Sequence, residues 1–287
     1  MHNIDKYTNN VFFGDNLLLL KELPSNSIEL IYIDPPFNTG KIQRRDNFTV
    51  IKSKNKKNNG FKGLGYDLKK TSTNQYIDKF DDFHNFITPR LEEAYRILSD
   101  NGSIYLHIDY REVHYIKILL DNIFGRESFI NEIIWAYDFG ARAKKRWPAK
   151  HDNILFYAKN PKQFTFNTEH LDREPYLAPG LVTPDKAALG KLPTDVWWHT
   201  IVSPTGKEKT GYPSQKPEAI IKRIITASSN PKDTVLDFFA GSGTTGIVSK
   251  KLDRNFILAD SNQQSIDVIK KRFKKDFPDY KLITKKI

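Results

Sequence analysis

Residues 234–246 read TVLDFFAGSGTTG, and this stretch decides the fold class. The run from Thr234 to Phe238 predicts a buried strand, and residues 244–252 predict the helix that follows it. Glycines between the two let the backbone turn sharply and approach a ligand closely, and the helix N-terminus offers unpaired N–H groups. A strand, a glycine turn and a helix in this order predict a ligand site in an α/β fold.

The glycine turn has an acidic partner further along the chain. Gly241, Gly243 and Gly246 match the dinucleotide pattern G-x-G-x-x-G, and Asp260 ends the next predicted strand 19 residues after Gly241. That is the usual place of a carboxylate that accepts hydrogen bonds from ribose hydroxyls. The pattern predicts a ribose-containing cofactor but does not identify which one. A carboxylate at Asp237 disfavours a pyrophosphate and could pair with an ammonium group. In addition, no second mononucleotide half follows in the sequence. Both observations disfavour a nicotinamide cofactor.

Strand and helix patterns alternate along most of the chain. We predict strands at 28–33, 103–108, 130–136, 154–158, 234–238 and 255–259 and near the C-terminus, and helices at 83–98, 113–123, 216–229, 244–252 and 263–273. Two segments, 41–79 and 160–212, break the alternation and are predicted to be irregular. The pattern predicts an α/β fold with a mostly parallel central sheet and helices on both faces.

A second polar turn follows the first predicted strand. Asp34-Pro35-Pro36-Phe37 stands where residues 28–33 end, on the crevice side of an α/β sheet. An exocyclic amino group of adenine or cytosine is a poor nucleophile because its lone pair is delocalised into the ring. The Asp34 carboxylate and the Pro35 carbonyl could each accept one of its N–H bonds and so localise that pair. Phe37 offers a face on which an extruded base could stack.

Composition sets outer limits on the function. The chain has 287 residues with 39% hydrophobic and 28% charged residues, which is typical of a globular protein. It contains no cysteine, which excludes disulfides, cysteine-based zinc sites and a thiol nucleophile. The start lacks the apolar run of a signal peptide, and no window resembles a membrane helix. We therefore expect a soluble, cytoplasmic protein without a membrane partner.

The net charge of +11 is unevenly placed. Residues 41–79 carry +8, residues 139–151 carry +5, and residues 270–287 carry +6. Concentrated basic segments in an otherwise acidic chain favour a polyanionic partner, although each alone could be solvated surface. The first segment has the Gly, Asn and Lys content of a mobile loop and directly follows the polar turn at 34–37. The last is predicted to be scaffold surface.

The two turns together resemble the beta class of amino-methylating DNA methyltransferases that use S-adenosylmethionine. IDPPFNTG at 33–40 resembles their catalytic motif and DFFAGSGTT at 237–245 their cofactor motif, in the circularly permuted order of that class. Residues 12–15 resemble the acidic turn beside the cofactor adenine, 212–217 the family's HPTQKP helix entry, and 145–155 the motif beside the target-base pocket. Mild departures, such as Phe37 for the commoner Tyr, remove no catalytic function.

The resemblance and the charge pattern imply a set of site residues. The catalytic residues are Asp34, Pro35, Pro36 and Phe37. The cofactor-binding residues are Asp15, Asp34, Ser214, Lys216, Asp237, Phe238, Phe239, Gly241, Ser242, Gly243, Thr244 and Asp260. The DNA-binding residues are Asn38, Lys41, Arg44, Arg45, Lys52, Lys54, Lys56, Lys57, Arg142, Lys144, Lys145 and Arg146. No metal is required.

The resemblance also implies the function and its organisation. We expect methyl transfer to N6 of a flipped adenine in double-stranded DNA, because family members that act on cytosine N4 more often carry Ser at position 34. Residues 1–159 and 213–287 form the catalytic and cofactor halves of one Rossmann-like methyltransferase domain, and 160–212 recognises the target, with Trp197 and Trp198 expected to be buried rather than stacked on DNA. A restriction endonuclease and a second copy of the chain are further partners to consider. Alternatives are a cytosine-N4, RNA or protein-amide methyltransferase, a non-catalytic DNA-binding relative and a NAD-dependent dehydrogenase.

Overall fold

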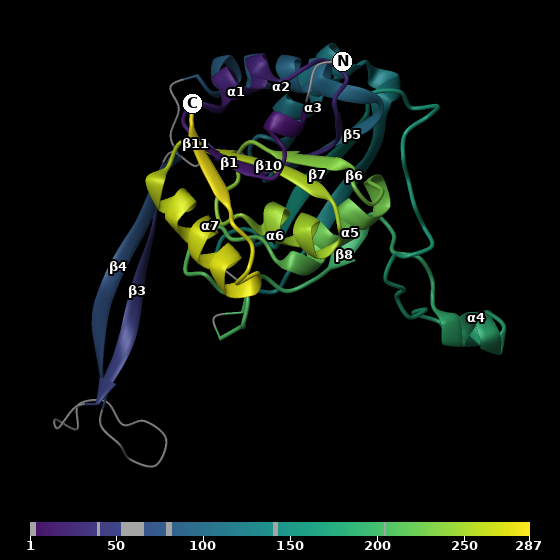
Figure 1. Ribbon diagram of the computed structural model, residues 1–287. Coiled ribbons are helices and arrows are strands. Elements are labelled where there is room, and N and C mark those ends of the chain that lie inside the picture. Colours follow the sequence, from purple (N-terminus) through teal and green to yellow (C-terminus); the bar gives the residue numbers. More distant parts are fainter. Residues whose placement is uncertain (1–3, 39–40, 53–65, 79–81, 140–142, 204) are drawn as a thin grey trace.

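The computed structural model describes residues 4–38, 41–52, 66–78, 82–139, 143–203 and 205–287, with the backbone alone for 41–52 and 66–78. Its centre is a nine-stranded sheet in the order β11-β1-β10-β9-β2-β5-β7-β6-β8 (Figure 1). The strands are β1 (Asn10–Phe13), β2 (Ile28–Ile33), β5 (Leu98–Ile108), β6 (Phe129–Ala136), β7 (His151–Ala158), β8 (Val196–Trp198), β9 (Thr234–Asp237), β10 (Asn255–Asp260) and β11 (Ile283–Lys286). Only β7 runs antiparallel to its neighbours among these strands, so the mostly parallel sheet is confirmed.

Helices cover both faces of the sheet, as predicted (Figure 1). One layer contains α1 (Asn16–Glu22), α2 (Phe83–Ile97) and α3 (Val113–Phe124), and the other contains α5 (Glu218–Ser228), α6 (Thr244–Lys251) and α7 (Gln263–Asp276). The short helix α4 (Pro184–Leu189) lies apart from both layers, and single 3-10 turns occupy Ile4–Lys6, Arg126–Ser128 and Pro179–Leu181.

Strand β2 shows why the sheet needs two helical layers. Alternate side chains of a strand point to opposite faces. Ile31 and Ile33 pack into the core beneath α1, α2 and α3, whereas Leu30 and Tyr32 pack into the core beneath α5. Because both faces are covered, the strand is apolar throughout, which is typical of parallel sheets.

The strand order of the sheet reverses between the neighbouring strands β9 and β2. After β2 the chain passes through α2 to β5 on one side, and after β9 it passes through α6 to β10 on the other. Ligands of doubly wound sheets bind outside the carboxyl ends of the strands at such a switch point. Asp34 directly follows β2, and Asp237 ends β9, so the fold brings the two predicted turns together.

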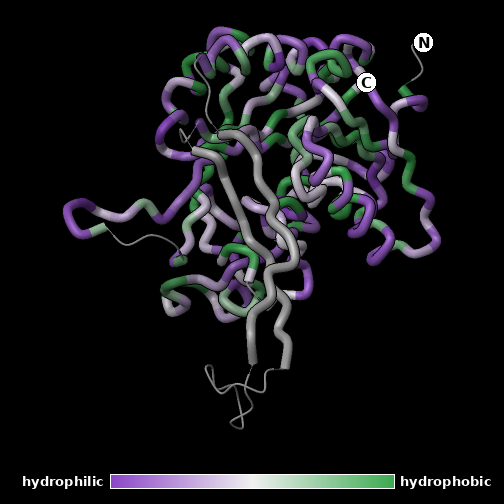
Figure 2. The backbone as a smooth tube through the Cα atoms, turned by 90° about the vertical axis from the view of Figure 1, so that its left-hand side faces the viewer, coloured by the Kyte–Doolittle hydropathy of each residue, from purple (hydrophilic) through white to green (hydrophobic). Residues whose placement is uncertain are grey.

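The basic segment after the catalytic turn is a β-hairpin, not an irregular loop. Strands β3 (Lys41–Lys52) and β4 (Tyr66–Asp78) pair in antiparallel fashion in a sheet of their own and project from the body (Figures 1 and 2). The expectation of an irregular segment is therefore wrong for these two strands. These two strands pair with each other and not with the central sheet. The alternation of strands and helices that predicts the central sheet therefore does not predict them. Residues 53–65 between them lie outside the described residues.

The segment 160–212 contains little regular structure, as expected, and carries α4 away from the body (Figure 1). The prediction that both tryptophans are buried is right for Trp197, which is 6% exposed, and wrong for Trp198, which is 74% exposed. The Trp197 indole N–H donates to the Thr194 carbonyl over 2.7 Å. Within the described ranges, no helix has both the length and the apolar character to cross a membrane.

Candidate active site

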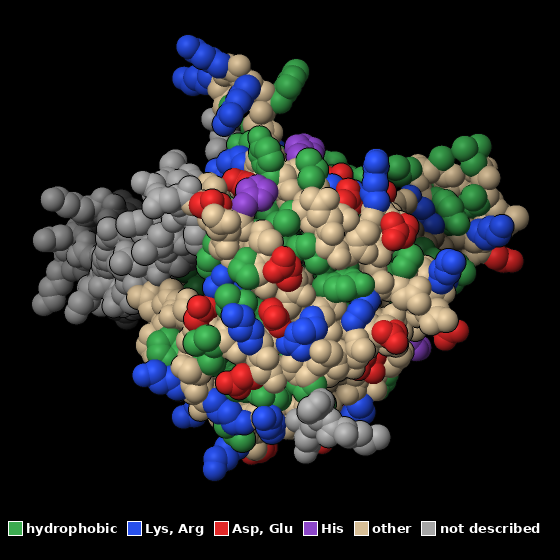
Figure 3. Space-filling model, turned by 90° about the horizontal axis from the view of Figure 1, so that it is seen from above, with side chains coloured by type: hydrophobic (Ala, Val, Ile, Leu, Met, Phe, Trp, Pro, Cys, Tyr) green, Lys and Arg blue, Asp and Glu red, His purple; other side chains and the backbone are tan. Residues whose placement is uncertain are grey.

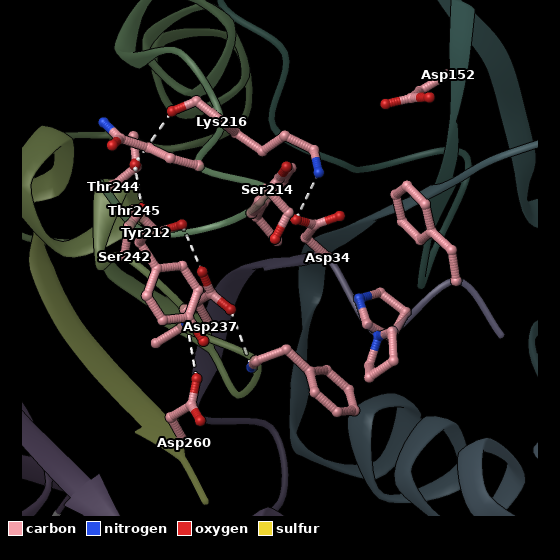
Figure 4. Close-up of a pocket in the computed structure, with 18 of the residues that line it drawn as sticks. Asp34, Asp152, Tyr212, Ser214, Lys216, Asp237, Ser242, Thr244, Thr245 and Asp260 are labelled. Atoms are coloured by element: carbon pink, nitrogen blue, oxygen red, sulfur yellow. Dashed lines mark hydrogen bonds and ion pairs between the residues drawn. The ribbon is translucent and has the colours of Figure 1, made fainter. Parts of the chain in front are cut away.

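A cavity of about 1230 Å³ opens at the switch point between β2 and β9 (Figure 4). That volume exceeds the roughly 300–1,000 Å³ of typical small-molecule sites, so a cofactor and an extruded base could share it. Its wall brings together most of the predicted catalytic and cofactor residues, namely Asp34, Pro35, Pro36, Phe37, Ser214, Lys216, Asp237, Phe239, Gly241, Ser242, Thr244 and Asp260.

The Asp34 carboxylate has one engaged and one unengaged oxygen. Its Oδ2 accepts a hydrogen bond from the Lys216 ammonium over 2.6 Å, and both side chains are largely buried. Its Oδ1 is buried and has no hydrogen-bond partner among the residues that the structure describes. A buried acceptor without a donor is costly, and such groups mark functional positions. Oδ1 is therefore free to accept an N–H from a ligand in the cavity.

Phe37 forms an aromatic surface beside this carboxylate. Its ring stacks on the buried ring of His107, with centroids 6.0 Å apart and planes 21° from parallel. The Lys216 ammonium lies 4.9 Å from the centroid of the Phe37 ring. Packing from behind by His107 fixes the ring, which presents an apolar face to the cavity as the sequence predicts.

A buried polar chain that the sequence analysis missed stands behind Phe37. His107 lies 3.0 Å from the Tyr32 hydroxyl through Nδ1 and 3.1 Å from Asp152 through Nε2, and the Tyr137 hydroxyl donates to Asp152 over 3.0 Å. A carboxylate only accepts, so His107 Nε2 donates to Asp152, and Nδ1 shares a hydrogen bond with the Tyr32 hydroxyl. Burial acts to raise the pKa of Asp152, but the hydrogen bonds from His107 and Tyr137 and the charge of Lys216 outweigh it and lower that pKa.

Tyr32, His107 and Asp152 come from β2, β5 and β7, and Tyr137 directly follows β6, so no local spacing connects the four. The signal in the sequence is a polar residue within a short apolar run, as with His107 in the last five residues of β5, IYLHI. Tyr32, Tyr137 and Asp152 line the cavity, which makes them candidates for contact with a bound base.

The cofactor half is built on the turn after β9. Gly241 has φ +50°, a conformation that favours glycine, and its amide donates to Asp260 Oδ2 over 2.8 Å. The other oxygen of Asp260 accepts from the Asn262 amide over 2.8 Å, and burial raises the pKa of this carboxyl. Asp260 therefore holds the glycine turn in addition to facing the cavity.

Asp237 is a buried carboxylate in the wall of the same cavity. It accepts from the Phe239 amide over 3.0 Å and from the Thr245 hydroxyl over 2.6 Å. Burial raises the pKa of Asp237 to about 7, because desolvation outweighs these two hydrogen bonds. Each oxygen accepts one hydrogen bond from the protein, which leaves acceptor capacity for a positively charged ligand group.

Four predicted residues lie away from the cavity wall. Asp15 caps α1 through the Leu17 amide and pairs with Arg90 over 2.7 Å, and Phe238 is fully buried in the core. Gly243 caps α6, where an added Cβ would lie 2.7 Å from Ile269 Cγ1, so its role is packing rather than cofactor approach. Asn38 donates to Glu112 over 3.0 Å, so it is held by the protein itself.

The predicted DNA-binding side chains are placed only in part. Lys144, Lys145 and Arg146 are exposed on the connection between β6 and β7. Lys41, Arg44, Arg45 and Lys52 lie on β3, whose side chains are not described, and Lys54, Lys56, Lys57 and Arg142 lie outside the described residues. Among the described side chains no group of three or more His, Asp or Glu is placed to hold a metal ion, and the prediction that none is needed stays a prediction.

The doubly wound sheet, the glycine turn at its switch point and the carboxylate facing it define a Rossmann-like enzyme that binds a nucleoside-containing cofactor. The family model for DNA methylases, N6_N4_Mtase, matches residues 28–271, which include both turns. The chain belongs to this DNA methylase family.

Individual relatives agree with the family assignment. Type II methyltransferase M.HpaI of Haemophilus parainfluenzae is 34% identical over 269 residues, which cover 93% of this chain and 75% of the relative. DNA adenine methyltransferase YhdJ of Escherichia coli is 33% identical over 264 residues, covering 89% of this chain and 79% of the relative.

Solved structures support the fold. The M1.HpyAVI–SAM complex aligns with a TM-score of 0.59 at 23% identity, covering 92% of this chain and 98% of that one. The PvuII cytosine-N4-specific DNA methyltransferase aligns with a TM-score of 0.63 at 15% identity, covering 92% of this chain and 85% of that one. At these identities the likeness concerns the fold alone.

Proposed function

We propose that this chain is a site-specific DNA methyltransferase that moves a methyl group from S-adenosylmethionine to N6 of an adenine flipped out of double-stranded DNA. The observation that carries the proposal is Asp34 Oδ1, a buried acceptor without a donor beside an aromatic face and a proline carbonyl. Adenine is favoured over cytosine because Asp stands at position 34 and because the relative YhdJ is named an adenine methyltransferase.

The cavity fits the proposed cofactor. Its turn supplies a glycine with positive φ after a strand, and the carboxylates Asp237 and Asp260 line the cavity, where they suit a ligand that carries an ammonium and ribose hydroxyls. A buried, ionised carboxylate is costly without a partner, and a cationic ligand group would relieve that cost at Asp237. S-adenosylmethionine supplies an activated methyl group on a sulfonium sulfur.

The protein's own residues would act on the target amino group. Asp34 Oδ1 and the Pro35 carbonyl would accept hydrogen bonds from its two N–H groups, which localises the lone pair on nitrogen. That pair would form the new N–C bond in line as the bond from the methyl carbon to sulfur breaks, and one amino proton would then leave. Phe37 supports the base from one face, and Lys216 fixes the second oxygen of Asp34. Positioning and electrostatics carry such a reaction, without a covalent enzyme intermediate.

Long-read sequencing of DNA from a methylation-free host that expresses the chain tests the proposal, since it reports the modified base, site and strand together. N6-methyladenine at one recurring sequence supports it. N4-methylcytosine at one site would reassign the target base, and DNA without any modified base would contradict the proposed function.

The raised pKa of Asp237 makes cofactor binding depend on pH. A cationic ammonium binds the ionised carboxylate better, so the affinity for S-adenosylmethionine should rise as the pH increases from 6 to about 7 and level off above it. Below pH 7 the limiting slope is about tenfold per pH unit. Calorimetric titration from pH 5.5 to 7.5 measures this.

Asp237→Asn is the control for this dependence, since it keeps the side-chain volume and removes the titration. It should bind the cofactor weakly with a flat pH profile. The raised pKa also means that folding stability falls as the pH rises from about 4 to 7, because the unfolded carboxyl ionises more easily. A wild-type affinity that does not change over this range would remove Asp237 from the ammonium site.

We also propose that the basic hairpin contacts DNA phosphates. Neutralising Lys52, Lys54, Lys56 and Lys57 together should weaken the binding of cognate and random duplexes about equally. The slope of log affinity against log salt should flatten by up to about 0.9 for each lost phosphate contact. Fluorescence anisotropy at several salt concentrations measures both effects, and the affinity for S-adenosylmethionine should not change.

Four exposed lysines on α7, at positions 270, 271, 274 and 275, give a matched control with the same loss of charge. Neutralising them should leave the salt slope unchanged. A hairpin variant with the wild-type slope would mean that its lysines only solvate the surface. Lost discrimination between cognate and random DNA would assign sequence reading to the hairpin instead of residues 160–212.

Residues 160–212 remain our proposal for target recognition, between catalytic and cofactor halves at 1–159 and 213–287. A partner restriction endonuclease and a homodimer stay predictions. Light scattering of the purified chain tests the second of them.

A further inference from the structure

The connection between β6 and β7 carries the most exposed aromatic side chain in the described part of the protein. Trp147 is 95% exposed, compared with 74% for Trp198 and 60% for Phe139. Tryptophan has a large apolar surface that proteins usually bury, so one left almost entirely in water is suited to contact a partner. We call residues 143–150 the arm.

The arm projects from the body and is strongly basic. Figure 2 shows it as a largely hydrophilic extension, and in Figure 3 its Lys and Arg side chains stand clear of the body at the top of the view, with a hydrophobic side chain beside them. Lys144, Lys145 and Arg146 directly precede Trp147, and residues 139–151 contain five basic residues and no acidic one. This charge matches a polyanion, and an aromatic ring among basic side chains suits one with stacked bases.

The arm lines a small cavity that shares residues with the active-site cavity. Arg146 and Pro148, the neighbours of Trp147, line a small cavity of about 240 Å³. Tyr137 and Asp152 line that cavity too, and they also line the large cavity. The Lys150 ammonium donates to the Asp138 carbonyl over 2.9 Å, which ties the last residue of the arm to the segment that follows β6. Trp147 therefore stands between two residues of a cavity that shares Tyr137 and Asp152 with the active-site cavity.

We propose that Trp147 is a DNA wedge. Its ring enters the base stack at the target pair and occupies the space left by the base that moves into the cavity. Extruding a base breaks its stacking and pairing, and stacking of the indole on the neighbouring bases replaces part of what is lost. The basic side chains beside Trp147 hold the flanking phosphates. This proposal rests on the proposed function.

The test compares two DNA substrates that differ only in the cost of extrusion. In one duplex the target adenine pairs with thymine, and in the other it lies opposite an abasic site. Single-turnover methylation by Trp147→Ala should be at least tenfold slower than wild type on the paired duplex and within about threefold of wild type on the abasic one. Trp147→Phe should keep most of the rate on both. With 2-aminopurine at the target position, Trp147→Ala should also lose most of the fluorescence increase on binding.

Trp198→Ala is the matched control, as it removes a second exposed tryptophan from another part of the chain. Any effect it has should be equal on the two duplexes. A Trp147→Ala variant with the wild-type rate on the paired duplex, or with the same deficit on both, would overturn the wedge. So would a change in oligomeric state on light scattering, which would make Trp147 a contact between copies of the chain. If wild type methylates neither duplex, the proposed function itself fails.

Discussion

Asp34→Ala is expected to slow single-turnover methyl transfer by about 30-fold or more while the affinity for S-adenosylmethionine stays within about threefold. The substitution removes Oδ1, the buried acceptor that we assign to the target amino group. Loss of a preorganised charged acceptor costs at least ~2–3 kcal/mol in the transition state, which corresponds to that factor. Rapid-quench measurement with saturating cofactor and cognate DNA gives the rate, and calorimetry gives the affinity.

Two further variants separate catalysis from stability. Lys216 is 8% exposed and bonds to Asp34. Asp34→Ala therefore leaves an almost buried ammonium without this acceptor and should also lower the melting temperature. Asp34→Asn keeps the side-chain volume and one acceptor oxygen. It should transfer the methyl group slowly but have a higher melting temperature than Asp34→Ala. Phe37→Ala should lose roughly 1–3 kcal/mol of base stacking. An Asp34→Ala variant that keeps a tenth of wild-type turnover would contradict the role assigned to Asp34.

Gly243→Val is expected to destabilise the protein by roughly 2–5 kcal/mol, even without cofactor. Gly243 has φ +73°, where a β-branched residue is strained, and an added Cβ would lie 2.7 Å from Cγ1 of the buried Ile269. The sequence alone suggests that valine here blocks the cofactor, but the clash lies in the packing of α7 against the turn. Urea unfolding without ligand measures the effect.

Gly180→Val is the control for this variant, because a Cβ at Gly180 meets no atom within 4 Å. It should unfold at the wild-type urea concentration. A Gly243→Val protein with wild-type stability and a lost cofactor affinity would restore the steric explanation and contradict the packing one.

The middle of the central sheet could be predicted because its strands are buried on both faces and its helices have one apolar stripe, so burial is visible in the sequence. Ile28–Ile33 and Glu218–Ser228 are examples. The strand β1 (Asn10–Phe13) has only four residues, too few to show a period. The hairpin of β3 and β4 was not predicted, because its strands pair with each other outside the main sheet.

The site could be predicted wherever one local segment supplies its chemistry, as at residues 34–37 and 237–245. It could not be predicted where the chemistry depends on contacts between distant strands. The chain from Tyr32 through His107 to Asp152 joins residues 75 and 45 positions apart. Lys216 bonds to one oxygen of Asp34 and leaves the other unpartnered. It is 182 residues away in the sequence and was expected to contact the cofactor.

The most direct test of the central claim is the identity of the methylated nucleoside formed by the purified protein. DNA incubated with wild type or Asp34→Ala and S-adenosylmethionine is digested to nucleosides and analysed by mass spectrometry. The account predicts N6-methyladenine from wild type and, under the same conditions, at most a few per cent of that amount from the variant. N4-methylcytosine from wild type, no methylated nucleoside, or equal N6-methyladenine from both proteins would contradict it.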